Sequence, residues 1–330
     1  MDTFRTPIKI NPSRERIHYT DGLLFLGSCF TGYIGSRLLE LHFNAVVNPS
    51  GVLFNPSSIA RTLRRINSGT LYQANELGFY RDLWFSFDHH TSFSHPDKAA
   101  CLERINREAE KAHFHLGKSR FVFVTFGTAW VYRLRDTGEI VANCHKWPAS
   151  QFDRILLHPE EIVREYAGLI SELRQQHPEL QVIFTVSPVR HLGDGMQENQ
   201  LSKSILILAA NELSAGMELC HYFPAYEIMM DDLRDYRFYE PDMVHPNQLA
   251  IDYIWKVFTE TFMDKETIAV AEEVDNLRKA SLHRPLHPER KEYQLFCESQ
   301  LKNIARLRVR YPFLDLSAEE TRFNEGLSGF

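Results

Sequence analysis

Apolar runs with the length of a strand alternate along this chain with stretches patterned like helices. The clearest strand-like runs are Gly22–Leu26, Phe121–Phe126 and Gln181–Val186, and shorter ones occupy 45–47 and 219–223. Helical patterns cover 32–41, 55–66, 98–113, 159–176 and 198–216. Nearly continuous apolar strands separated by helices are typical of a parallel sheet covered on both faces. The pattern therefore predicts a three-layer α/β/α domain over residues 15–262, with a parallel sheet of about five strands.

Two stretches do not follow this alternation. Residues 68–119 contain an aromatic, histidine-rich run and are expected to form an insertion in the α/β domain. Within it, His89, His90 and His95 raise the question of a metal site, but adjacent histidines on a strand point to opposite faces. An aromatic lid or a packed insertion is the favoured interpretation. Residues 263–330 are charged and helical, and are expected to form a helical C-terminal extension.

Composition argues against several classes of protein. The net charge of -6 lacks the basic footprint of a nucleic-acid binder. No apolar run approaches the roughly 18 residues of a membrane helix, and the first residues lack the apolar core of a signal peptide. The five cysteines are widely spaced and contain no C-x-x-C, which fits a reducing compartment better than a disulfide framework or a zinc site. We expect a cytoplasmic protein without a metal or other cofactor.

Polar segments follow the expected strands. They are Gly27–Thr31, Asn48–Gly51, Gly127–Trp130, Ser187–His191 and, after a polar aromatic loop, Asp242–His245. Because ligands collect at the carboxyl ends of parallel strands, we expect these segments to line one pocket. A hydroxyl or thiol attacks an acyl carbon once a base takes its proton, and that base needs an anion to orient it. A nucleophile in the first segment, with Asp242 three residues before His245, predicts acyl-transfer chemistry.

In this order, the segments resemble the blocks of the SGNH, or GDSL-like, hydrolases. Gly27-Ser28-Cys29-Phe30-Thr31 resembles the signature of the GSCFA family, a branch of that superfamily. The resemblance covers about residues 20–262. It implies the SGNH-hydrolase fold, which is flavodoxin-like. It also implies that Gly51 contributes an N–H to the oxyanion hole, that Asp242 is the acid of a catalytic triad and that His245 is its base.

The chain departs from the superfamily pattern at two positions. A gapless overlay places Cys29 at the nucleophile position, whereas a shift by one residue places Ser28 there, and both alternatives stay open. Ala129 stands where the superfamily has an oxyanion-binding Asn. Because a missing donor of this kind typically costs ~10²–10³ in rate, an active enzyme needs a substitute. The polar residues expected to bind the oxyanion or the substrate are Asn48, Thr128, Asn143, His145, Arg190 and His191.

Each main candidate also has a purely structural alternative. Cys29 would be a small buried hydrophobic residue, and Ser28 a helix N-cap. Asp242 would cap the helix that follows His245, and Gly51 would be a turn glycine with positive φ. Arg190 and His191 would form a salt-bridged rim rather than a substrate contact.

The expected function is an acyl esterase or deacetylase that acts on an ester of a small polar or carbohydrate-like molecule. An acyltransferase with the same nucleophile–His–Asp site is the first alternative. A thiol nucleophile and an aromatic cover over the site would favour it, because excluding water suppresses hydrolysis. A non-catalytic module that binds a carbohydrate or a partner is the second, and Ala129 supports it. The acyl group, the alcohol and the oligomeric state are left open by the sequence.

Overall fold

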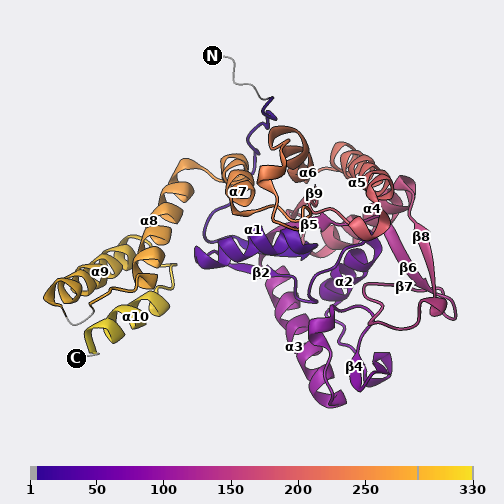
Figure 1. Cartoon of the computed structure of the whole chain (residues 1–330), viewed down its shortest axis with the longest axis horizontal. Coiled ribbons are helices and arrows are strands. Elements are labelled where there is room, and N and C mark those ends of the chain that lie inside the picture. Colours follow the sequence, from indigo (N-terminus) through magenta and orange to yellow (C-terminus); the bar gives the residue numbers. More distant parts are fainter. Residues whose placement is uncertain (1–5, 288–289, 329–330) are drawn as a thin grey trace. The chain divides into compact units, whose positions relative to one another are not determined.

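The computed structural model describes residues 6–287 and 290–328, and its centre is a parallel sheet (Figure 1). The five strands, in the spatial order β10-β9-β5-β1-β2, all pair in parallel with their neighbours. Their bounds are β1 Gly22–Gly27, β2 Ala45–Val47, β5 Ser119–Phe126, β9 Gln181–Val186 and β10 Cys220–Phe223. Numbered along the chain, this is the 2-1-3-4-5 order of flavodoxin-like sheets. The predicted fold class is confirmed.

Helices cover both faces of the sheet because the strand residues are apolar on both sides. One face contributes Val124 and Phe184 to a buried core shared with four helices, α2, α3, α4 and α5. On the other face Phe123 and Phe223 pack against Phe258 of helix α7, with ring centroids 5.5 and 5.7 Å apart. The helices of these layers are α1 Cys29–Glu40, α2 Pro56–Ser68, α3 Lys98–Leu116, α4 Pro159–Gln176, α5 Met196–Gly216 and α7 Gln248–Phe262.

Helix α2 begins where its local sequence predicts. The Oδ1 of Asn55 accepts a hydrogen bond from the N–H of Ser58 at 2.8 Å, and Pro56 occupies the first turn. Both are favoured at a helix start, because the cap satisfies a free N–H and proline has none to satisfy. The helix ends at Gly69, whose φ of 67° is the left-handed conformation common at C-termini.

Residues 69–118 form a compact insertion between α2 and β5. It contains a short hairpin of β3 Gly78–Tyr80 and β4 Leu83–Phe85, followed by helix α3. Two 3₁₀ turns, η1 Ala74–Glu76 and η2 Thr91–Phe93, flank the hairpin. The aromatic, histidine-rich run therefore lies in packed structure.

A second, antiparallel sheet follows β5 and was missed in the sequence. Its strands are β6 Trp130–Leu134, β7 Ile140–Val141 and β8 Phe152–Leu156, in the order β7-β6-β8, with the 3₁₀ turn η3 Ala149–Gln151 before β8. These strands are short and only partly buried, so they lack the continuous apolar run that marked β1, β5 and β9.

The chain divides into two compact units. Over the described residues, the first comprises 6–11, 22–35 and 45–258, and the second 12–21, 36–44, 259–287 and 290–328. The second unit is helical, with α8 Lys265–Leu282, α9 Lys291–Arg310 and α10 Ser317–Ser328, as predicted for the C-terminal region. Its core includes Tyr19 stacked on Phe43, with ring centroids 4.0 Å apart. In the part of the chain described here, no helix has the length and apolar character needed to cross a membrane.

Candidate active site

The candidate nucleophiles lie at the turn between β1 and α1. β1 ends at Gly27, whose φ is 141°, and a Cβ at this position would collide with the Thr125 carbonyl group. Glycine is therefore required where the first strand passes β5. Ser28 is only 1 % exposed, and its Oγ has no hydrogen-bond partner in the described part of the chain. Cys29, the first residue of α1, is a partly exposed free thiol.

The protonation of Cys29 is governed by its surroundings. Burial disfavours the thiolate and raises the pKa of the Cys29 thiol, while the residue's own backbone N–H acts in the opposite direction. The first N–H groups of a helix have no intrahelical acceptor, so the start of α1 offers donors to an anion. The thiol is thus protonated at rest and needs a base, while hydrogen-bond donors lie beside it.

Hydrogen bonds between distant segments fix this turn. The Asn48 Oδ1 accepts from the Gly27 N–H at 2.9 Å, and the Gly27 carbonyl oxygen accepts from the Leu53 N–H at 2.9 Å. The Ser28 N–H donates to the Thr125 carbonyl oxygen at 3.2 Å. The segments after β1 and β2 and the end of β5 are therefore joined at one edge of the sheet. The role of Asn48 here is to hold the turn.

Gly51 closes a turn that only glycine can close. Its φ is 77°, and a Cβ at this position would collide with His90. Its N–H donates to the Asn48 carbonyl oxygen at 2.7 Å. In this conformation the N–H is engaged, so it would have to leave Asn48 before it could bind an oxyanion. This geometry agrees with the structural alternative for Gly51, which is a turn glycine with positive φ.

A buried lysine joins the segments after β5 and β9. The Lys203 side chain on α5 is fully buried, and its Nζ donates to the carbonyl oxygens of Gly127 and Ser187, both at 2.7 Å. Burial lowers the pKa of Lys203 to about 7. Lys203 was missed in the sequence because lysine is usually exposed. Its position three residues before Leu206, on the buried side of α5, was the available signal.

The polar groups of the segment after β5, Gly127–Trp130, are also engaged in hydrogen bonds. The Thr128 hydroxyl lies 3.1 Å from the Ser202 Oγ, and it accepts from the Trp130 N–H at 3.1 Å. The Ala129 N–H donates to the same Ser202 Oγ at 2.7 Å. Neither Thr128 nor Ala129 therefore presents a free donor in this structure.

Asp242 and His245 lie on a tight hairpin loop. The Glu240 N–H donates to the His245 carbonyl oxygen at 2.8 Å, and Tyr239 forms an antiparallel bridge with Pro246. Met243 turns the loop with a φ of 59°. The first element before the loop is the 3₁₀ turn η6 Tyr236–Phe238, and helix α7 follows it.

The carboxylate of Asp242 orients the imidazole of His245. Its Oδ2 lies 2.7 Å from the His245 Nδ1, and its Oδ1 accepts from the N–H groups of Val244 and His245 at 2.9 and 3.0 Å. The backbone N–H of His245, its imidazole and the Val244 N–H lower the pKa of Asp242 to about 2. Asn247, not Asp242, caps α7, since its Oδ1 accepts from the Ala250 N–H at 3.1 Å.

The charges of the hairpin act on helix α1 near its start. Burial raises the pKa of Tyr33, one helical turn after Cys29, and the charges of Cys29, Glu240 and Asp242 add to the effect. Tyr33 therefore lies within electrostatic reach of both the turn and the hairpin. Among the described residues, no hydrogen bond joins His245 to Ser28 or Cys29, although the sequence predicts one. The side chain of His245 is 36 % exposed, and its Nε2 is left for another partner.

Arg190 and His191 follow β9 and point to different neighbours. The guanidinium of Arg190 lies 4.9 Å from the ring centroid of Tyr239. Among the side chains that the structure describes, no carboxylate pairs with this guanidinium. The His191 N–H donates to the Asn199 Oδ1 at 2.9 Å, and its ring packs edge-on against Phe54 at 5.3 Å.

Asn143 and His145, two proposed substitutes for the missing Asn, are held in the aromatic insertion. The His145 ring stacks on Phe85 at 4.3 Å, and its Nε2 bonds the Ser86 carbonyl oxygen at 2.9 Å. Burial lowers the pKa of His145 to about 4. The Asn143 Nδ2 donates to the Thr91 Oγ1 at 3.1 Å. Their polar atoms are therefore engaged away from the nucleophile turn.

The histidines of the insertion have separate roles. His89 is buried against Tyr72, and burial lowers its pKa to about 3. The Nδ1 atoms of His90 and His95 accept from the N–H groups two residues further on, at 3.2 and 3.0 Å. Over residues 6–287 and 290–328, no group of three or more His, Cys, Asp or Glu is placed to hold a metal ion.

Comparison with known proteins identifies the family. The GSCFA family matches residues 22–258, and the description "GSCFA domain protein, C-terminal domain" matches residues 274–329. The search of curated proteins found no match. A solved structure from Streptococcus pneumonia, described as a "putative platelet activating factor", is 14% identical, covers 72% of this chain and 83% of its own, and has a TM-score of 0.36. Because the first match spans well over half of the sequence, this chain belongs to the GSCFA family.

Proposed function

We propose that this protein is an acyl esterase or deacetylase of the SGNH type, acting on an ester of a small polar or carbohydrate-like molecule. The observation that carries the proposal is the 2.7 Å contact between Asp242 and the His245 Nδ1. This contact directs the other imidazole nitrogen, Nε2, to act as the base. The pair lies on a loop within electrostatic reach of the helix that begins at Cys29.

Cys29 is the better-supported nucleophile. Its thiol is partly exposed, whereas Ser28 is 1 % exposed and would have to emerge before it could meet a substrate. Because burial keeps the Cys29 thiol protonated, attack requires that His245 take the proton as the S–C bond forms. The imidazolium then protonates the leaving alcohol. Water, activated by the same imidazole, hydrolyses the thioester and restores the thiol.

The oxyanion needs donors that are free. Helix geometry gives the first N–H groups of α1 no intrahelical acceptor, but the Thr31 N–H donates to the Ser28 carbonyl oxygen at 3.0 Å. The N–H groups of Cys29 and Phe30 are therefore the candidates in this helix. The Gly51 N–H would join them only after the turn at Asn48 opens. Catalytic hydrogen bonds are often long before substrate binds and tighten in the complex. The same tightening around a bound substrate would bring the His245 Nε2 to the Cys29 thiol.

The two alternatives keep specific support. Partial burial of Cys29 favours an acyltransferase, because a water-poor site slows hydrolysis of the acyl-enzyme. The engaged N–H of Gly51 and the alanine at 129 favour a binding module without catalysis. We place the activity in the cytoplasm, in keeping with five cysteines that are all free.

A screen with p-nitrophenyl esters of increasing chain length, with and without an acyl-CoA and a panel of sugars, separates these functions. A burst with esters alone supports the esterase, and turnover that depends on an acceptor supports the acyltransferase. Silence throughout, with folded protein, would leave the binding module.

Labelling with iodoacetamide tests the nucleophile in the same samples. We expect Cys29 to react faster than Cys144, the other partly exposed thiol, whose pKa burial raises to about 11. His245→Ala should suppress labelling of Cys29 and leave that of Cys144 unchanged, because only Cys29 depends on this base. Equal labelling of Cys29 in the wild type and the variant would mean that the Asp242–His245 pair does not activate it.

A further inference from the structure

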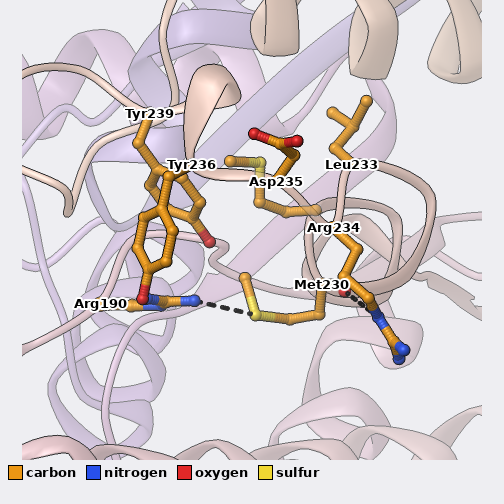
Figure 2. A pocket seen from close by; sticks show the side chains of 8 residues that line it. Arg190, Met230, Leu233, Arg234, Asp235, Tyr236 and Tyr239 are labelled. Carbon is orange, nitrogen blue, oxygen red and sulfur yellow. Dashed lines mark hydrogen bonds between the residues drawn. The ribbon is translucent and has the colours of Figure 1, made fainter.

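A cavity of about 130 Å³ lies between the segment after β9 and the chain that leads to the Asp242–His245 hairpin. Its lining includes Arg190, Met230, Arg234, Tyr236 and Tyr239 (Figure 2). Cavities of about 150 Å³ accept a molecule the size of benzene. This volume therefore suits one functional group of a ligand better than a whole drug-sized ligand.

Arg190 is the unusual member of this lining. Arg234 pairs with Asp231 at 2.6 Å, and Arg237, just outside the cavity, pairs with Asp235 at 3.2 Å. Among the side chains that the structure describes, no carboxylate pairs with Arg190, and its Nη2 lies 3.8 Å from the Sδ of Met230. A partly buried guanidinium without a counter-charge carries an uncompensated desolvation cost.

Aromatic rings hold the guanidinium of Arg190 at the cavity wall. It lies 4.9 Å from the ring centroid of Tyr239 and 5.9 Å from that of Tyr236. Figure 2 shows both tyrosines beside Arg190, with the carboxylate of Asp235 and the guanidinium of Arg234 directed elsewhere. Contact with a ring face leaves the edge of the planar fork, with its N–H groups, free to bind a carboxylate or phosphate in bidentate fashion.

A π-helical turn forms part of the cavity wall. Helix α6 Ala225–Glu227 continues into a π-helical turn, η5 Ile228–Asp232, which supplies Met229 and Met230 to the lining. Such turns are rare and are frequent at functional sites. The thioether sulfur of Met230 is a weak acceptor for the guanidinium of Arg190. A ligand oxygen in its place would accept a stronger hydrogen bond.

One residue of the cavity wall is bridged to the residue that follows the proposed base. Tyr239, whose ring packs on Arg190, forms an antiparallel bridge with Pro246, the residue directly after His245. Residues bridged in this way lie about 4.5–5.5 Å apart at Cα. A ligand group bound by Arg190 would therefore belong to a molecule that reaches His245.

We propose that the Arg190 cavity binds an anionic group, a carboxylate or a phosphate, of the substrate whose ester bond His245 helps to cleave. The assignment to a substrate rests on the proposed function. The binding of the anion does not, and it is measurable without turnover.

Phenylglyoxal modification, mapped by mass spectrometry, tests the binding directly. At constant ionic strength set with sodium chloride, we expect inorganic phosphate or acetate to protect Arg190 from modification and to leave Arg237 unprotected. The stronger of the two protectants identifies the group. No modification of Arg190 in chloride alone, or equal modification with every anion, would overturn the proposal.

Variants link the binding to the substrate. If esters are turned over, the protecting anion should inhibit competitively, and Arg190→Gln should raise its inhibition constant about ten- to a hundred-fold. Arg190→Lys should fall between, because it keeps the charge without the fork. Arg237→Gln is the matched control and should change nothing. Protection without ester turnover would retain the anion site and reject the esterase, whereas turnover with inhibition unchanged in Arg190→Gln would reject the subsite alone.

Discussion

The two halves of the candidate site are held together in opposite ways. The Asp242–His245 hairpin is exposed, and the hydrogen bonds within it join residues no more than five positions apart. The turn at Ser28 and Cys29 is mostly buried, and it is fixed by bonds to Asn48, Leu53 and Thr125 in other segments. The base is thus oriented locally, while the display of the nucleophile depends on the assembled sheet.

This contrast predicts how each half responds to damage. Loss of a local bond in the exposed hairpin should cost activity and leave the fold intact. Loss of a buried contact behind the sheet edge should cost stability first, because buried carbonyls left without donors are expensive.

The largest expected effect is that of Asp242→Asn. The variant should lower kcat/KM about 10⁴-fold, as loss of the orienting anion does in other triads, with little change in melting temperature. Since the folded pKa of Asp242 is about 2, its contribution is complete above the unfolded value near 4 and disappears only as pH falls through about 2. Titration of Asp242 should therefore not appear in a pH–rate profile above about pH 3. Asp136→Asn, at an exposed position outside the hairpin and the Arg190 cavity, is the control, and a comparable loss there would contradict a specific role for Asp242.

Lys203→Met should have an intermediate effect, on stability. The variant leaves the Gly127 and Ser187 carbonyl oxygens without their donor, and we expect a loss of about 2–4 kcal/mol in the free energy of unfolding measured with urea. Glu212→Met, at an exposed position of the same helix, should change it by less than about 0.5 kcal/mol.

The difference in the free energy of unfolding between the wild type and Lys203→Met should depend on pH with a defined sign. The pKa of Lys203 is about 7 in the folded protein and about 10.4 in an unfolded chain, so between these values the unfolded state binds the extra proton. Stability contributed by Lys203 should therefore rise from pH 7 to pH 10 relative to Lys203→Met. A flat difference across this window would mean that the buried lysine does not titrate there.

Ser28→Ala should have the smallest effect. The hydroxyl is buried without a partner, so its removal should change the free energy of unfolding by less than about 1 kcal/mol. If Cys29 is the nucleophile, kcat/KM should stay within about threefold of the wild type. Thr31→Val removes a second buried, unpartnered hydroxyl, in the first turn of α1, and serves as the control. A loss of activity in Ser28→Ala but not in Thr31→Val would identify Ser28, and not Cys29, as the nucleophile.

Elements with a strong local signal were predicted closely from the sequence. The helix at Pro159–Gln176 has the predicted bounds, and it opens with a capping contact from the His158 N–H to the Glu161 Oε2 at 2.8 Å. The strand at Gln181–Val186 was likewise predicted, since it is buried throughout. The antiparallel sheet of β6, β7 and β8 was not, because short, half-exposed strands carry neither a continuous apolar run nor a regular alternation.

The sequence by itself determined the alternation of strands and helices and the Asp242–His245 pair, since both depend on periodicity or on bonds between near neighbours. Only the tertiary structure decided that Ser28 is buried while Cys29 is partly exposed, and that Arg190 lacks a carboxylate among the described residues. Only it decided that Lys203 spans two strand ends. The physical reason is that burial and pairing of these side chains are set by segments far away in the chain, which no local pattern records.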